Sequence, residues 1–353
     1  MSLQFKLGLD QLVKSSGLMD FPGFRLRAYQ RGQEILNYSK GKVYDFYDLA
    51  SLTKIIFTTT YYMDAVSKKK LKLFQSVQEL LPWYPYSQVK VGDLLSHSAG
   101  NTWWQPFYKK IDLSLNSDQR YQMLEGLVQK VPRSRSLKAT YSDIDFFILG
   151  SLMQALEKRP LYLIWLDLKD KYFDHTDFHF NPLDRKPLYL RSRYAPTEDC
   201  SWRKKVLQAE VHDENAWALG GVGPHAGLFG TLDDLSDYGL WLRSLQMSGK
   251  GYGAISKGVA QKFISRSLPS QRGDWGYGFM LPSKLNSSSG SLFSPKSFGH
   301  TGFTGISMWL DPKRDLLVCL LSNRIHPTRG QQGFVRLRPL LHDWIVQFIE
   351  EKK

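Results

Sequence analysis

The 353-residue sequence contains only two cysteines, Cys200 and Cys319, and so it predicts no disulfide framework. It has no run of about 18 apolar residues, so we expect no integral membrane segment. The N-terminus lacks the charged stretch followed by a long apolar stretch that marks a standard export signal. As written, the sequence predicts a cytoplasmic protein, and a periplasmic location stays open if the chain has been trimmed.

Acidic residues are in the minority: 33 aspartates and glutamates stand against 47 lysines and arginines, which gives a net charge of +14. Such an excess can attract anionic ligands. The basic residues are dispersed, however, and no nucleic-acid-binding motif accompanies them. We therefore expect a solvated basic surface and no nucleic-acid partner, with a basic surface-binding protein as an alternative.

The segment Ser51-Leu52-Thr53-Lys54 is an S-x-x-K motif that opens an apolar stretch with helical spacing. We expect Asp48 to be the N-cap of this helix. Residues three apart share a helix face, so the two side chains should be neighbours. A serine near the positive end of the helix dipole can become a nucleophile if burial lowers the pKa of the lysine that takes its proton. The same pattern occurs without an apolar helix at four other places: Ser39–Lys42, Ser67–Lys70, Ser87–Lys90 and Ser201–Lys204.

Two further polar segments strengthen the hypothesis of a reactive serine. Tyr141-Ser142-Asp143 precedes an apolar helical run, where the tyrosine can share protons with a serine–lysine pair and the carboxylate can bind the lysine. His300-Thr301-Gly302 precedes two predicted strands, where the glycine lets a substrate backbone approach closely and the threonine can hold a carboxylate.

The order S-L-T-K, Y-S-D, H-T-G resembles the serine β-lactamase and penicillin-binding protein superfamily, whose motifs are S-x-x-K, Y-x-N and K-T-G. It looks most similar to the class C β-lactamase-like branch, which includes esterases, D-amino-acid peptidases and peptidoglycan-fragment amidases. Residues 22–32, 92–100 and 227–235 also resemble family segments, and the match spans about residues 20–350. The resemblance implies an α+β fold, with an antiparallel sheet flanked by helices and a mainly helical subdomain.

The resemblance also implies roles for the motif residues. Ser51 would attack an amide or ester carbonyl, Lys54 would accept its proton with Tyr141 as partner, and Asp143 would orient the lysine. The backbone N–H groups of Ser51 and Phe303 would form the oxyanion hole.

The third motif and a glycine-rich loop pair supply the expected substrate contacts. His300 and Thr301 would bind a substrate carboxylate or polar tail, beside Gly302 and Phe303. The segments 211–216 and 220–227 resemble loops of amidase-like family members and contribute His212, Asp213 and His225. These three residues would grip the substrate, or alternatively the loop is simply held by its own polar side chains.

Two motif positions depart from the family. Asp143 stands where the family carries asparagine, and an ionised carboxylate only accepts hydrogen bonds. His300 stands where the family carries lysine, and a histidine is less reliably charged near neutral pH. Both departures favour an amidase or esterase over a dedicated β-lactamase, and they also motivate a non-catalytic ligand-binding alternative.

The motifs spread from Ser51 to Gly302, which favours one catalytic domain over residues 1–353. We place its sheet region at about 20–48 and 275–353, and its helical region at about 49–274. The segment 160–226 contains five prolines and is expected to be irregular. Trp103 and Trp104 follow a loop beside the expected cleft, where they would stack on sugars or apolar groups or pack against the helical region.

The sequence therefore predicts a serine hydrolase that works through an acyl-enzyme, without a cofactor or metal. The preferred substrate is a peptidoglycan-derived peptide or muropeptide. A small-ester esterase with weak β-lactam turnover is the alternative enzyme.

Overall fold

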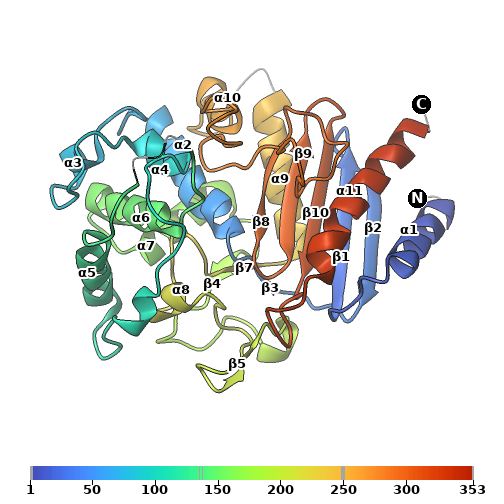
Figure 1. Cartoon of the computed structure of the whole chain (residues 1–353), viewed down its shortest axis with the longest axis horizontal. Helices are drawn as coiled ribbons and strands as arrows, with labels where there is room; N and C mark the ends of the chain where they lie inside the picture. The colour runs from blue at the N-terminus through green and yellow to red at the C-terminus, as the bar shows by residue number, and fades with distance from the viewer. Residues whose placement is uncertain (1–2, 135, 137, 248–250, 352–353) are drawn as a thin grey trace.

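The computed structural model describes residues 3–134, 136, 138–247 and 251–351 of the chain. A five-stranded antiparallel sheet occupies one side of the molecule and a group of helices the other (Figure 1). The strand order β2-β1-β10-β9-β8 joins the first hairpin to the last three strands. The expected α+β class is thus confirmed. The strands of this sheet are β1 Gly23–Gln30, β2 Gln33–Gly41, β8 Phe298–Gly302, β9 Ile306–Asp311 and β10 Leu316–Ser322.

Strand β10 divides the hydrophobic core into two parts. It is buried along its whole length, which explains its continuous apolar sequence. Side chains alternate between the two faces of a strand, so successive residues enter different cores. Leu316, Val318 and Leu320 belong to one cluster, and Leu317, Cys319 and Leu321 belong to the other.

Helices α1 (Leu3–Ser16) and α11 (Gly333–Glu351) cover one face of the sheet (Figure 1). The ring of Phe5 lies 4.6 Å from that of Trp344 and 3.8 Å from that of Phe348, measured between centroids. An apolar stripe over residues 331–350, from Phe334 to Phe348, predicts a helix that corresponds to α11, whereas the sequence analysis does not predict α1.

Helix α9 (Leu232–Met247) covers the opposite face of the sheet. The expected boundaries put these residues in the helical region, whereas the helix packs on β10, β9 and β1. Helix α9 can pack this closely on the sheet because residue 239 is a glycine: a Cβ added there would lie 2.6 Å from the side chain of Leu317. The Cys319 thiol also donates to the carbonyl oxygen of Leu235 at 3.7 Å.

The helical half is built around α6, which is buried over most of its length. The segment expected to be irregular contains a twelve-residue helix, α7, whose N-cap is Pro160, a residue that helix starts tolerate. None of the helices in the described residues combines the length and apolar character needed to cross a membrane.

The remaining elements are the π-helix η1 Lys54–Thr59, the 3-10 helices η2 Phe107–Lys109 and η3 Arg191–Arg193, the α-helices α2 Thr60–Ser67, α3 Val77–Leu80, α4 Val91–Leu95, α5 Ser117–Val128, α6 Asp143–Glu157, α7 Leu161–Tyr172, α8 Glu214–Ala218 and α10 Lys257–Ile264, and the short strands β3 Tyr47–Asp48, β4 His179–Phe180, β5 Asp199–Cys200, β6 Lys205–Val206 and β7 Leu228–Gly230.

The contact between α9 and the sheet predicts that Gly239→Ala lowers the free energy of unfolding by about 1–3 kcal/mol, because the added methyl overpacks against Leu317. Gly126→Ala in α5 is the matched control, since its Cβ would meet no atom within 4 Å. It should stabilise the protein by up to about 1 kcal/mol through helix propensity. Urea denaturation of both variants measures the difference, and equal stabilities would contradict the tight packing.

Candidate active site

Ser51 lies in the turn immediately before a helical segment that begins at Leu52. The Nζ of Lys54 donates to Ser51 Oγ at 2.9 Å, and the hydroxyl of Tyr141 donates to the same oxygen at 2.7 Å. The lysine is fully buried. The structure thus brings together the serine, lysine and tyrosine that the motifs single out.

The prediction that Asp48 caps the helix is wrong. Asp48 lies in β3, and its carboxylate accepts hydrogen bonds from the backbone N–H of Ala50 at 2.8 Å and of His212 at 2.7 Å. Ala50 has a φ of +44°, a left-handed conformation that a non-glycine residue keeps only when its surroundings hold it. The aspartate therefore shapes the turn that presents Ser51.

The expected lowering of the Lys54 pKa by burial is also wrong as a net effect. Burial is the largest influence and lowers the pKa, but the interactions with the Asp143 carboxylate, and next with Tyr141, together outweigh it, so the pKa is raised. Lys54 Nζ lies 2.7 Å from Asp143 Oδ1 and donates to the carbonyl oxygen of His225 at 3.2 Å. Burial raises the pKa of Tyr141. At rest the site therefore holds a lysine cation beside a neutral phenol and a neutral serine.

The start of α6 fixes Tyr141 and Asp143. Ser142 is the N-cap and accepts from the backbone N–H of Ile144, while Asp143 N–H donates to the carbonyl oxygen of Trp103 at 3.0 Å. The ring of Tyr141 stacks on Trp275, with 5.7 Å between centroids and 13° between planes.

Edge strand β8 lies against the turn before Ser51. A Cβ on Gly302 would lie 3.0 Å from the carbonyl oxygen of Leu49, which is tighter than an ordinary contact, so glycine favours this approach. Thr304 Oγ1 donates to the carbonyl oxygen of Asp48 at 2.8 Å. Among the hydrogen bonds of the described residues, none uses the backbone N–H of Ser51 or Phe303.

His300 does not carry the charge expected of it. The side chain is only 1% exposed, and its Nδ1–H donates to the carbonyl oxygen of Thr301 at 2.7 Å. Burial, followed by the Lys54 charge, lowers the pKa of His300 to about 3. Thr301 is partly exposed, so of the two it is the residue more open to a substrate.

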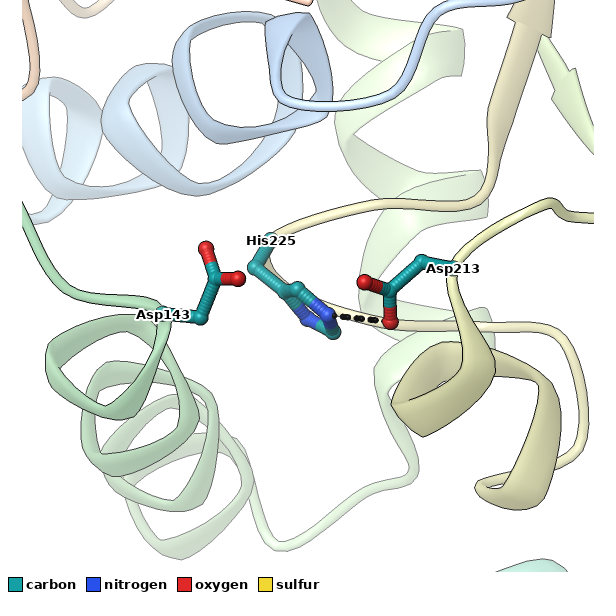
Figure 2. A group of neighbouring side chains, drawn as sticks. All are labelled: Asp143, Asp213 and His225. Atoms are coloured by element: carbon teal, nitrogen blue, oxygen red, sulfur yellow. Dashed lines mark hydrogen bonds and ion pairs between the residues drawn. The ribbon is translucent and has the colours of Figure 1, made fainter. Parts of the chain in front are cut away.

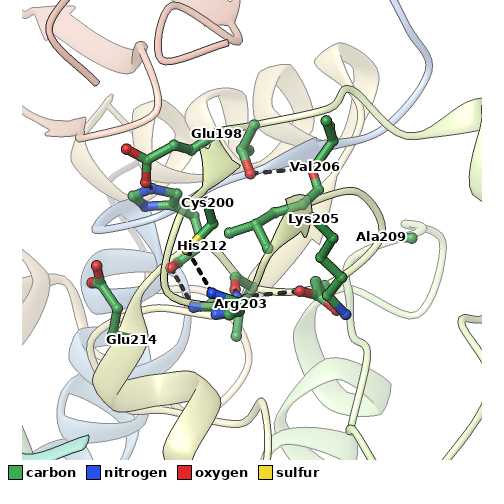
Figure 3. Close-up of polar contacts among 12 residues, drawn as sticks. Glu198, Cys200, Arg203, Lys205, Val206, Ala209, His212 and Glu214 are labelled. Carbon is green, nitrogen blue, oxygen red and sulfur yellow. Dashed lines mark hydrogen bonds and ion pairs between the residues drawn. The ribbon is translucent and has the colours of Figure 1, made fainter. Parts of the chain in front are cut away.

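His212 holds the turn at Phe303. Its Nε2 lies 3.0 Å from Glu198 Oε2, and its ring stacks on Phe303 at 5.6 Å (Figure 3 shows its neighbours). Burial alone would raise the pKa of Glu198, but hydrogen bonds from His212 and Arg329 lower the pKa to about 2. The buried His212 ring therefore positions the turn, whereas the sequence predicted a substrate contact.

Asp213 and His225 face each other beside Asp143 (Figure 2). His225 Nε2 lies 2.9 Å from Asp213 Oδ1, which also accepts from Ala216 N–H and so caps α8. Burial would raise the pKa of Asp213, but the His225 charge and hydrogen bond lower it. The three side chains offer ligand atoms within 4.8 Å of one another, yet Lys54 already neutralises Asp143, so a divalent cation would have to displace the lysine.

Comparison with known proteins shows the family. Residues 10–339 match the family model described as "Beta-lactamase". The chain belongs to the β-lactamase family. A protein from Salmonella gallinarum (strain 287/91 / NCTC 13346), named "Putative D-alanyl-D-alanine carboxypeptidase", is 31% identical over 338 residues, which cover 86% of this chain and 76% of that protein.

Solved structures share the fold at lower identity. A novel penicillin-binding protein homolog from Caulobacter crescentus has a TM-score of 0.65 at 18% identity, covering 97% of this chain and 98% of the other. The LovD9 mutant of simvastatin synthase from Aspergillus terreus has a TM-score of 0.69 at 16% identity, covering 99% of each chain. This β-lactamase-family protein is a serine hydrolase.

Several residues around the β-lactamase-family site were not found by sequence reasoning. Trp275 packs on Tyr141, Glu198 binds His212, and the guanidinium of Arg324 lies 5.0 Å from the centroid of the Phe303 ring. None of them lies in a motif. Tertiary contacts alone bring them to the site, so the sequence offers no local signal.

Because burial lowers the pKa of His300 to about 3, we expect this residue not to ionise between about pH 5.5 and 7.5. The pH dependence of KM for a carboxylate substrate should keep its shape in His300→Asn. The exposed His175 gives a control variant, His175→Asn. An ionisation in this range that vanishes only in His300→Asn would contradict the prediction.

Proposed function

We propose that this serine hydrolase cleaves an amide bond in a peptidoglycan-derived peptide through an acyl-enzyme on Ser51. The observation that carries the proposal is the pair of hydrogen bonds that Ser51 Oγ accepts from Lys54 and Tyr141. The name of the Salmonella relative, a D-alanyl-D-alanine carboxypeptidase, supports a peptide of this class.

Lys54 in its neutral form takes the proton of Ser51 as the serine oxygen bonds to the substrate carbonyl carbon. Tyr141 gives its proton to the leaving nitrogen and regains one from Lys54 as the C–N bond breaks. Water then attacks the acyl carbon and loses a proton to Lys54. The bond between Ser51 Oγ and the acyl carbon breaks, Lys54 returns the proton to Ser51 Oγ, and the acid departs.

The backbone N–H groups of Ser51 and Phe303 are proposed to hold the oxyanion. Contacts of Thr304 and Gly302 with residues 48–50 support this, because they bring the two segments together. One such donor is commonly worth about 2.7–4 kcal/mol of transition-state stabilisation. Thr301 is proposed to hold the substrate carboxylate, while His300 stays neutral.

A small-ester esterase with weak β-lactam turnover is the second candidate. Asp143 favours it, since this carboxylate is paired with Lys54 and offers no amide donor to a β-lactam carbonyl. The peptide remains preferred because the 31%-identical relative carries a carboxypeptidase name.

Ser51→Ala tests the hydrolase proposal. Turnover should fall by a factor of roughly 10³ or more, because the nucleophile is removed while the fold persists. Muropeptides, p-nitrophenyl esters and nitrocefin are the substrates to compare, with covalent labelling by a fluorophosphonate as an independent readout. Survival of more than a few per cent of the activity, or of the labelling, would remove Ser51 as nucleophile.

Asp143→Asn tests the charge on Lys54. The carboxylate is the main group that raises the lysine pKa against burial, so its loss should lower that pKa. Lys54 must be neutral to accept a proton, so the rising limb of kcat/KM against pH should move to lower pH.

The matched control for this variant is Asp167→Asn, because Asp167 pairs with Arg159 at the surface and is 62% exposed. The rising limb of kcat/KM against pH should not shift in Asp167→Asn. The restored amide of Asp143→Asn should also speed reaction with nitrocefin and slow reaction with the peptide. A limb that stays fixed, or moves to higher pH, would show that Asp143 does not set the lysine charge.

A further inference from the structure

Five aromatic residues form a continuous surface beside the active site, which we name the aromatic platform. They are Trp103, Trp104, Tyr108, Trp202 and Trp217. Neighbouring ring centroids are 5.7, 6.4, 4.6 and 5.2 Å apart along this order. Trp103 is 63% exposed and Trp202 is 40% exposed. Rings that packed only against the helical region would be buried, so the platform faces solvent.

Buried polar groups hold the platform in place. The guanidinium of Arg203 lies over the rings of Trp202 and Trp217, at 5.4 and 5.1 Å. It donates to the carbonyl oxygen of Val211 and, as Figure 3 shows, to that of His212. Asn215 accepts from the backbone N–H of Tyr108 at 2.9 Å. These anchors fix the rings before a ligand arrives, which reduces the entropy lost on binding.

The platform is continuous with the catalytic residues at both ends. The carbonyl oxygen of Trp103 accepts from the backbone N–H of Asp143. Trp217 lies in α8, whose N-cap Asp213 pairs with His225. A ligand on these rings would therefore border the site of Ser51.

The border of the platform is cationic. Lys109 Nζ lies 5.8 Å from the ring centroid of Tyr108. Lys110 and Lys204 each stand two positions along the chain from a platform residue, and all three lysines are exposed and form no ion pair within the described part of the chain. Two acidic residues near the anchors are paired: Glu210 with Arg203 and Lys205, and Glu214 with Arg329. A ligand with carboxylates complements this border.

We infer that the aromatic platform binds the sugar backbone of a carboxylate-bearing glycan, so that the substrate is a sugar-linked peptide and not a free one. Sugar rings present C–H faces that stack on aromatic rings, and the lysines attract the carboxylates. Stacked rings with lysines also suit single-stranded nucleic acid, but such a ligand offers no acyl group to Ser51. The inference rests on the proposed hydrolysis of a peptidoglycan-derived peptide.

The kinetic test compares a disaccharide-linked peptide with the same peptide free of sugar. The measured quantity is the ratio of the two kcat/KM values, linked over free. Trp103→Ala and Trp202→Ala should each lower this ratio by roughly 5- to 30-fold, through KM, as loss of a tryptophan anchor usually does. Phe74→Ala is the matched control, since Phe74 is a 69% exposed aromatic residue outside the platform. It should leave the ratio unchanged, and an unchanged ratio in the platform variants would overturn the inference.

A binding test separates this inference from the proposed hydrolysis. Calorimetry with a soluble N-acetylglucosamine tetramer should detect binding to the Ser51→Ala protein, and adding Trp103→Ala or Trp202→Ala should abolish it. If the sugar binds but the wild-type protein cleaves no peptide, the result would support sugar binding by the platform and refute the proposed hydrolysis. Peptide cleavage without sugar binding, or salt-sensitive binding of an oligothymidylate in its place, would overturn the platform alone.

Discussion

The buried ion pair between Lys54 and Asp143 is the interaction on which the site depends. A buried lysine without a counter-charge would lose its proton, and removing one partner of such a pair commonly costs about 3–5 kcal/mol. Asp143 supplies that charge from the start of α6, and Lys54 supplies the ammonium that donates to Ser51. Two helices and the loop at His225 therefore meet at one buried nitrogen atom.

A second constraint is the close approach of strand β8 to the turn that precedes Ser51. Strand β8 lies close against the turn before Ser51, and Gly302 eases this approach, because an added Cβ would lie 3.0 Å from the carbonyl oxygen of Leu49. Asp48 ties the same turn to the His212 loop, and His212 in turn packs on Phe303. The left-handed Ala50 is thus held by its hydrogen bond to Asp48 and by its contact with Gly302 of β8. The nucleophile and the proposed oxyanion donors are consequently set by the same contacts.

Much of this arrangement follows from local sequence. Local patterns predict a hairpin over residues 22–39, the two strands around the turn at 311–315, a helix after a capping box at 231–234 and a last helix over about 331–350. Motif order places Ser51, Lys54 and Tyr141 together. The sequence misses α1, although Phe5, Leu9 and Val13 recur at helical spacing, and α7, because Pro160 looks like a breaker. The charge states of the site residues are harder to predict from the sequence. The pKa of Lys54 and of His300 depends on burial and on partners far along the chain, and no motif encodes those.

These charge states decide how the site can meet an anionic substrate. Burial lowers the pKa of both His97 and His300, and the nearby Lys54 charge lowers it further, so both rings are neutral beside one cation. Asp143 neutralises that cation. The centre therefore exerts little net attraction on a carboxylate. In the proposed arrangement, the attraction of a carboxylate-bearing substrate comes from exposed lysines near the aromatic platform, such as Lys109, and recognition is separate from the chemistry at Ser51.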